Sequence, residues 1–546
     1  MSRLYSRDPF IDLIFPYSLM RSFTELSSHF IRHENFPVLA LIIANLFIGV
    51  LIHTNYGESW DERHRILYAV DSLNAYRGNE TKLDDEKGPF YVMLAWIGTQ
   101  VLGKILPQWQ LIDRWHWMNF LSFQLGIFFL YRLCRRIADR KSSIAATLLF
   151  NTQPLIWGHS FINPKDIPFM AFFLGSVEMG LSMTDTWCSN PNPIRYPQLK
   201  MKSLARTVAA GIFLGFSCAI RNLGFASGFL VAAVVLVRKR LRAIPILIMY
   251  FATGCLITYI LWPNLWDSPL KYFSNSIESS LNFSWEGKVT FASNEYQIGE
   301  LPRNYLPTLL TLQFTEPVIL LFVLGITIAF IKSLRCQVAW EIIAMLAAWF
   351  FVPVIAVVIL QPNMYDNFRQ FLFITPPIFA FSAIALGSIF QKIRNPAWQA
   401  AILAVILLPG IYWSIKLHPY QYIYYNNLVG GAGGAFRKYD TDYWVTSYRE
   451  VTDFLNTNTG SGAMIVVWGP HQIVERFARD DLKVINYRRA DEAMHSSLFQ
   501  GYAVISSRHN KDLYLYAQSP VLFQVERDGA ILAVVKSLNP ADPGNP

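Results

Sequence analysis

Apolar residues along this chain gather in long runs rather than in the spread of a globular core. Most runs hold roughly 16–22 residues, which as a helix is the length needed to cross a hydrocarbon layer of about 30 Å. The pattern therefore predicts an α-helical polytopic membrane protein with about 11 transmembrane helices. The predicted spans are 36–54, 116–132, 143–158, 167–184, 206–220, 223–237, 243–262, 314–331, 338–360, 369–390 and 397–416.

Basic residues lie between these runs, in clusters at 132–141, 195–206, 238–242, 332–335 and 392–394. Short loops rich in lysine and arginine stay in the cytoplasm. We therefore predict an integral inner or plasma membrane protein whose N-terminal segment 1–35 is cytoplasmic. The predicted outer segments are the loops 55–115, 159–166, 263–313 and 361–368, together with the C-terminal tail.

Two segments fit the span pattern poorly. Arg221-Asn222 divides a long apolar run, and this pair is either a tight outer turn, which we favour, or a polar site within the membrane. The stretch 89–106 is too interrupted for a span, so we expect a helix at the outer interface.

Composition supports the membrane interpretation. The 546 residues are 53% hydrophobic and only 16% charged, whereas soluble domains carry about 25% charged residues. The net charge of +9 belongs to the short basic loops, so no nucleic-acid partner is predicted. The five cysteines fall in apolar runs or basic loops, which implies no disulfide framework.

The composition changes after the last predicted span. Residues 417–439 form an aromatic and glycine-rich connection, and 440–546 have the pattern of a small extracytoplasmic α/β domain. The expected elements are a helix at 443–456, a strand at 464–468, a helix at 471–479, strands at 483–487 and 502–506, and a hairpin at 521–536 that turns at Asp528-Gly529.

Three polar segments of the predicted outer loops could carry chemistry: Trp60–Glu62, Asp84–Lys87 and Asn163–Asp166. Taken singly, they are explained by a helix cap or by interfacial anchors. If the loops converge, carboxylates could take a proton from an acceptor hydroxyl or hold a divalent metal. Lysines and arginines could neutralise a leaving phosphate. This combination suits transfer from a phosphate-linked donor.

At these residues the sequence resembles C-type glycosyltransferases. The shared pattern is Asp61-Glu62 after the first span, Glu86-Lys87 before a proline, and Asp166 at the end of the second outer loop. The chain is most similar to the bacterial protein O-mannosyltransferase-like family, which includes the lipid A aminoarabinose transferase. The likeness covers roughly 36–416 and lies in the order and topology of the segments.

The resemblance assigns roles to four carboxylates. It implies that Asp61 is the catalytic base and that Glu62 beside it shapes the site. Glu86 and Asp166 match positions of the polar pocket and are the candidates for holding a divalent metal, the only cofactor considered. Asp166 is counted with the catalytic residues, and Glu86 with those that bind substrate.

The resemblance also indicates cations for substrate binding. Lys87 and Arg369 match candidate contacts to the lipid phosphate, and Lys165 is a second lysine of the expected pocket. Arg303 is included because Leu301–Tyr305 match the family, although the family usually has an aromatic residue where Arg303 stands.

The predicted activity is transfer of a hexosyl or pentosyl group from a polyprenyl-phosphate sugar to a lipid, glycan or protein acceptor at the outer, periplasmic-type face. Asp61 would deprotonate the acceptor hydroxyl, and the anomeric configuration would invert. One alternative is a transporter or flippase of lipid-linked glycans. The presence of Glu178 and Glu341 within predicted spans favours this alternative. Another is a glycan polymerase or ligase of the same fold. No zinc spacing, P-loop or dinucleotide fingerprint is present in the sequence.

Overall fold

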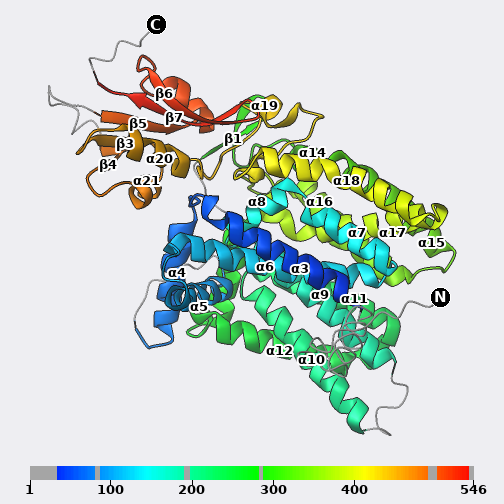
Figure 1. The fold of residues 1–546 in the computed structure, drawn as a ribbon. Coiled ribbons are helices and arrows are strands. Elements are labelled where there is room, and N and C mark those ends of the chain that lie inside the picture. Colours follow the sequence, from blue (N-terminus) through cyan, green and yellow to red (C-terminus); the bar gives the residue numbers. More distant parts are fainter. Residues whose placement is uncertain (1–33, 80–86, 190–196, 282–286, 490–500, 540–546) are drawn as a thin grey trace, which may run out of the picture.

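The computed structural model describes residues 34–79, 87–189, 197–281, 287–489 and 501–539 (Figure 1). Long helices make up most of the molecule, and a small sheet with short helices lies over one end of the bundle. The fold class is the predicted one: an α-helical polytopic membrane protein with a C-terminal α/β region. Glu86 lies outside the described residues.

The bundle contains helices from the apolar runs and from the predicted outer loops. They are α3 (Phe36–Ile52), α4 (Glu62–Ala75), α5 (Phe90–Ile105), α6 (Leu111–Arg135), α7 (Arg140–Asn151), α8 (Pro154–Ile162), α9 (Asp166–Cys188), α10 (Pro197–Cys218), α11 (Phe225–Lys239), α12 (Ile244–Leu261), α13 (Pro269–Leu281), α14 (Tyr305–Leu312), α15 (Glu316–Leu334), α16 (Trp340–Leu360), α17 (Pro376–Lys392) and α18 (Pro396–Lys416).

Six helical stretches among the described residues are long and apolar enough to cross a membrane. Five of them are α3, α9, α15, α16 and α18, and the sixth runs through α11 and α12. Their outer faces expose large apolar side chains, such as Phe47, Leu320 and Ile415, each more than two-thirds exposed. Such surfaces are stable against lipid but not against water, so the chain is an integral membrane protein.

α9 lies in the middle of the bundle. Nearly all of its residues are buried, and it packs against α6, α10 and α11. Its first residue, Asp166, therefore opens a rigid and largely buried helix.

Two predicted spans are interrupted. The range 143–158 divides into α7 and α8, because Pro154 cannot donate a backbone hydrogen bond and holds Gln153 in an extended conformation. The range 369–390 begins with a 3-10 helix, Arg369–Ile374, before Pro376-Pro377 starts α17.

The C-terminal region is built on a five-stranded sheet with the order β4-β3-β5-β7-β6. β3 pairs in parallel with β4 and β5, whereas β7 pairs antiparallel with β5 and β6. The elements are α19 (Gly431–Ala435), α20 (Tyr448–Asn458), β3 (Met464–Val467), α21 (His471–Phe477), β4 (Lys483–Asn486), β5 (Gly501–Ser506), α23 (Lys511–Tyr514), β6 (Val521–Arg527) and β7 (Ala530–Ser537).

The hairpin β1 (Lys288–Phe291) and β2 (Asn294–Gln297) belongs to the loop between α13 and α14. It contacts the chain before α20, where the Thr290 N–H donates to Asp440 at 3.2 Å.

Helix α20 begins at Tyr448, five residues later than the helix expected at 443–456. Val445 has a φ of +50°, and the Asp442 carboxylate accepts hydrogen bonds from Tyr422 and Ser447. These bonds compete with the helix and hold the segment before Tyr448 as a tight, buried loop.

The connection 417–439 is folded rather than loose. Tyr420, Tyr422, Tyr424 and Tyr425 are at most 2% exposed, so they pack in the core. The glycine run forms α19, whose Ala432 N–H donates to Asp528 in the turn between β6 and β7.

Candidate active site

Asp61 stands where the chain enters α4. After α3 the chain makes a 3-10 turn at His53–Asn55, and the Trp60 N–H then donates to the Trp444 carbonyl at 3.1 Å. Asp61 is the N-cap residue of α4. Its carboxylate Oδ2 lies 3.5 Å from Arg369 Nη2 and 3.9 Å from Lys165 Nζ, and the side chain is 32% exposed.

Lys165 and Asp166 are positioned by Asn163. The Asn163 side-chain oxygen accepts the backbone N–H groups of Lys165 at 3.1 Å and of Asp166 at 2.8 Å, which turns the chain into α9. Asp166 then pairs with two guanidinium groups, those of Arg221 and, at 3.1 Å, Arg369. Because Asn163 also donates to Asp166 at 3.0 Å, this buried carboxylate is fully engaged.

Arg369 is the centre of the cluster. It pairs with Asp166 and, at 3.0 Å, with Asp366, while its planar group lies over the rings of Trp444 and Tyr365. Asp366 in turn pairs with Arg508 of the C-terminal region at 2.7 Å. The ion pairs with two different carboxylates and the stacking contacts fix the guanidinium in one orientation.

Glu62 points away from this cluster. Its buried carboxylate accepts the Ser59 N–H at 2.6 Å and lies 3.1 Å from His116 Nε2. These contacts close the turn that presents Asp61.

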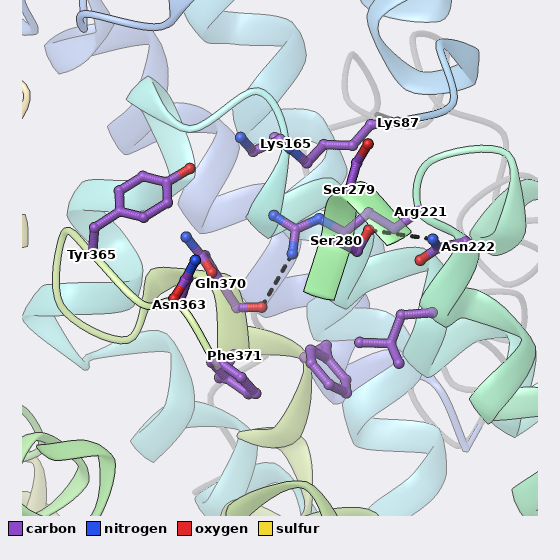
Figure 2. A pocket seen from close by; sticks show the side chains of 12 residues that line it. Lys87, Lys165, Arg221, Asn222, Ser279, Ser280, Asn363, Tyr365, Gln370 and Phe371 are labelled. Carbon is purple, nitrogen blue, oxygen red and sulfur yellow. Dashed lines mark hydrogen bonds between the residues drawn. The ribbon is translucent and has the colours of Figure 1, made fainter. Parts of the chain in front are cut away.

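Cations, polar groups and a few apolar side chains line a cavity of about 130 Å³ (Figure 2). One of its lining residues, Lys165, contacts Asp61. Lys87, Lys165 and Arg221 contribute positive charge, and Tyr365 and Gln370 come from the loop before α17. In Figure 2 the Arg221 guanidinium lies between Lys165 and Gln370, to whose carbonyl it donates.

The electrostatics of the cluster favour anions. Burial, together with Lys87, Arg65 and Arg369, brings the pKa of Lys165 well below its usual value, although Asp61 opposes this. Burial alone would raise the pKa of the Asp61 carboxyl, but Arg369, Lys165 and Arg65 outweigh it and hold that pKa below the usual value. Asp61 is therefore ionised at neutral pH, and an additional anion would relieve the repulsion among the cations.

A second hollow, an open cleft of about 680 Å³, lies between α4 and the C-terminal region. Asp61 lines this cleft, while Lys165, which contacts Asp61, lines the cationic cavity. The other lining residues are Trp60, Arg63, His64 and Leu67 on one side and Trp468, Gly469, Pro470, Gln472, Asn486, Tyr487 and Arg488 on the other.

The structure brings Asp61, Lys165, Asp166 and Arg369 together, with Lys87 lining the adjacent cavity. Arg303 does not join them, because it is exposed and its Nε lies 3.4 Å from Gln361 Oε1.

The described residues do not fit a divalent metal. They contain no group of three or more histidine, cysteine, aspartate or glutamate side chains that could hold one. The oxygens of Asp166 are occupied by two arginines and an asparagine, and cations rather than carboxylates surround Asp61.

The sequence interpretation missed Arg221 as a member of the cluster, together with Asp366 and Arg508. For Arg221, a signal was present in the sequence, namely the break of the apolar run at Arg221-Asn222. The turn there is tight, since a Cβ on Gly224 would lie 2.5 Å from the Cys218 nitrogen, and the Arg221 side chain reaches the polar cluster.

No family model and no curated protein matches the chain. Among solved structures, it is similar to the apo oligosaccharyltransferase of Archaeoglobus fulgidus, with 13% identity and a TM-score of 0.49 over 87% of this chain and 70% of that chain. It is also similar to ArnT from Cupriavidus metallidurans bound to undecaprenyl phosphate, with 12% identity and a TM-score of 0.49 over 93% and 98%.

Arabinofuranosyltransferase AftD from Mycobacteria matches with 12% identity and a TM-score of 0.43, over 92% of this chain and 40% of that chain. At these identities and scores, the activities, substrates and site residues of these three proteins are not carried over to this chain.

Proposed function

We propose that this chain is a membrane glycosyltransferase that moves a sugar from a polyprenyl-phosphate donor to an acceptor hydroxyl on the outer face of the membrane. The observation that carries the proposal is the position of Asp61, which lines the open cleft and contacts Lys165 of the cationic cavity. A base between an acceptor space and an anion space is what a direct displacement requires.

The cationic cavity suits the donor phosphate. Lys87, Lys165 and Arg221 line it, and Arg369 pairs with two of the carboxylates beside it. Fixed cations stabilise the negative charge that develops as the phosphate leaves. An incoming phosphate would also compete with Asp61 for Lys165 and Arg369, which are held at the long distances of 3.9 and 3.5 Å. Donor binding would thereby release the base.

The transfer is a single displacement. The acceptor oxygen forms a bond to the anomeric carbon while Asp61 takes the hydroxyl proton. The bond from that carbon to the phosphate oxygen breaks on the opposite face, and the polyprenyl phosphate leaves with the electron pair. The configuration inverts, and no nucleotide is needed because the energy resides in the sugar–phosphate bond.

We assign Asp166 and Glu62 positioning roles rather than proton transfer. Asp166 orients Arg221 and Arg369, and Glu62 fixes the turn before α4. Both carboxylates are buried and bonded to these neighbours, which limits their access to a substrate hydroxyl.

The transporter alternative drew on Glu178 and Glu341. In the structure both pair with arginines, Glu178 with Arg136 at 3.0 Å and Glu341 with Arg238 at 2.8 Å. These ion pairs are explained as links between helices. Neither glutamate therefore supports the transporter alternative.

The test compares the wild type with Asp61→Asn. Purified full-length protein is given radiolabelled polyprenyl-phosphate sugars and a membrane extract as acceptor source. We expect transfer by the wild type and a loss of about 10²–10⁴-fold in Asp61→Asn, the contribution of a general base. Asp71→Asn, on the same helix and outside the cluster, is the matched control and should transfer normally.

Binding of the lipid product separates a lost base from a misfolded site. Polyprenyl phosphate should bind Asp61→Asn at least as well as wild type, and Lys87→Ala and Arg221→Ala more weakly. If no donor in the panel gives transfer and lipid-linked sugar instead crosses liposomes, the transferase proposal is wrong.

A further inference from the structure

We propose that the cleft between α4 and the C-terminal sheet binds the acceptor and that this acceptor is a saccharide carrying an anionic group. The inference rests on the proposed transferase function, for which it names the acceptor class. The cleft holds about 680 Å³ and contains Asp61 in its wall, so whatever fills it meets the base.

Aromatic rings form the corner of the cleft nearest Asp61. Trp60 is 39% exposed, and its ring centroid lies 6.2 Å from that of Trp468 at an interplanar angle of 80°. Tyr487 lines the opposite wall. Rigid aromatic faces offer large contact areas to the apolar faces of sugar rings at little cost in conformational entropy.

The backbone at Gly469 allows the two tryptophans of this corner to lie close together. Gly469 follows Trp468 with a φ of +88°, and a Cβ there would lie 3.1 Å from the Trp60 ring. Glycine therefore lets the end of β3 approach Trp60. The Trp60 N–H is bonded to the Trp444 carbonyl, so a sugar stacked on Trp60 is held beside the next residue, Asp61.

Polar groups complete a lining suited to hydroxyls. Gln472 and Asn486 bring amides that can both donate and accept. The Asn486 amide is oriented by His471 Nδ1 at 3.2 Å. A lipid tail would offer the Gln472 amide no hydrogen-bond partner, which disfavours an apolar occupant.

The charge of the cleft indicates the anionic group. Arg63 and Arg488 line it from opposite walls and both are exposed. The one carboxylate in the lining, Asp61, is already neutralised by Lys165 and Arg369. Guanidinium groups bind carboxylates and phosphates through paired hydrogen bonds, so a uronic acid or a phosphorylated sugar fits this surface.

The chemistry of the acceptor can be tested on the membrane extract itself. We expect the acceptor activity to bind an anion-exchange resin, to survive protease and to be destroyed by periodate, which cleaves sugar diols. An acceptor destroyed by protease, or one that passes through the resin, would overturn the proposal.

Variants test the cleft in the transfer assay. Trp468→Ala and Arg488→Gln should each raise the acceptor KM by about tenfold or more, as loss of an anchor does, with the donor KM unchanged. Trp398→Ala and Arg394→Gln, exposed residues outside the cleft, are the matched controls. Unchanged acceptor KM in both cleft variants, with transfer intact, would refute the cleft and leave the transferase standing.

A binding measurement tests the cleft even if no sugar transfer is detected. Full-length protein is titrated with tetragalacturonate and with the neutral maltotetraose. We expect tighter binding of the acidic probe, weakening with salt and in Arg488→Gln. If this holds but no sugar is transferred from any donor, the saccharide site stands and the transferase fails. Equal binding of the two probes, or none, would contradict the anionic preference.

Discussion

Adjacent carboxylates of this chain have opposite environments. Asp61 is one-third exposed and faces Arg369 and Lys165, whereas Glu62 is buried against Ser59 and His116. Their positions on α4 explain the division, since neighbouring residues of a helix point about 100° apart. Only Asp61 can therefore reach a substrate.

The pH dependence of transfer should report the cations around Asp61. These hold its pKa below the usual value, so the base stays ionised until the pH falls beneath the ordinary carboxyl range. Removing the positive charge in Lys165→Met should raise that pKa. The acidic limb of the kcat/KM profile, which reports the free enzyme, should then move to higher pH than in the wild type.

Two further variants control this experiment. Lys165→Arg keeps the charge and should keep the limb near its wild-type position. Lys104→Met removes an exposed lysine of α5 and should leave the profile unchanged. Identical limbs in Lys165→Met and wild type would mean that Asp61 is not the titrating base.

At the scale of elements, hydropathy predicts where helices run but not where they break. The range 36–54 became α3 and 338–360 became α16 with nearly the expected bounds. The interruptions at Pro154 and at Pro376-Pro377 depend on prolines inside apolar runs, which a window average does not detect.

Part of the candidate site could also be predicted from the positions of the spans. Asp61, Lys165 and Arg369 lie at the ends of predicted spans, and topology alone brings such ends to one side. The partners Asp366 and Arg508 could not be inferred, because their pairing depends on how the C-terminal region packs against the loop before α17. The burial of Tyr422 and Tyr425 depends on the same packing.

Charged links join the helices at the other end of α9. Glu178 pairs with Arg136, the C-cap residue of α6, while Asp185 pairs with Arg136 and, at 2.9 Å, with Arg238 of α11. Arg238 also binds Glu341 of α16. A single network thus connects four helices.

Breaking this network should destabilise the bundle without changing the chemistry. Glu178→Gln removes one of the two carboxylates that pair with the largely buried Arg136, and breaking a buried pair costs about 3–5 kcal/mol. We expect a clearly lower unfolding temperature in detergent and unchanged transfer per folded molecule. Glu34→Gln, an exposed partner of Arg135, is the control and should unfold as wild type. Lost transfer in a stable Glu178→Gln protein would instead assign this network a functional role.

At the scale of the whole molecule, the site depends on the contact between the bundle and the C-terminal region. The walls of the open cleft come from these two parts. Buried Glu58 pairs with Arg476, and Asp113 pairs with Arg449 at 3.3 Å. These ion pairs hold α20 and α21 against the start of α4 and of α6.

Loosening this contact should separate acceptor chemistry from donor binding. In the double variant Glu58→Gln/Asp113→Asn, two buried pairs are lost, so the C-terminal region should become more accessible to limited proteolysis. Transfer should fall by about tenfold or more, because each tenfold loss of rate corresponds to only 1.36 kcal/mol in the barrier.

Polyprenyl phosphate should still bind this double variant, since Lys87, Lys165 and Arg221 all belong to the bundle. Asp481→Asn removes a surface pair with Arg479 inside the C-terminal region and should change neither property. If transfer persists while the C-terminal region is cut, the region plays no part in acceptor binding, and the reactive surface would have to lie wholly within the bundle.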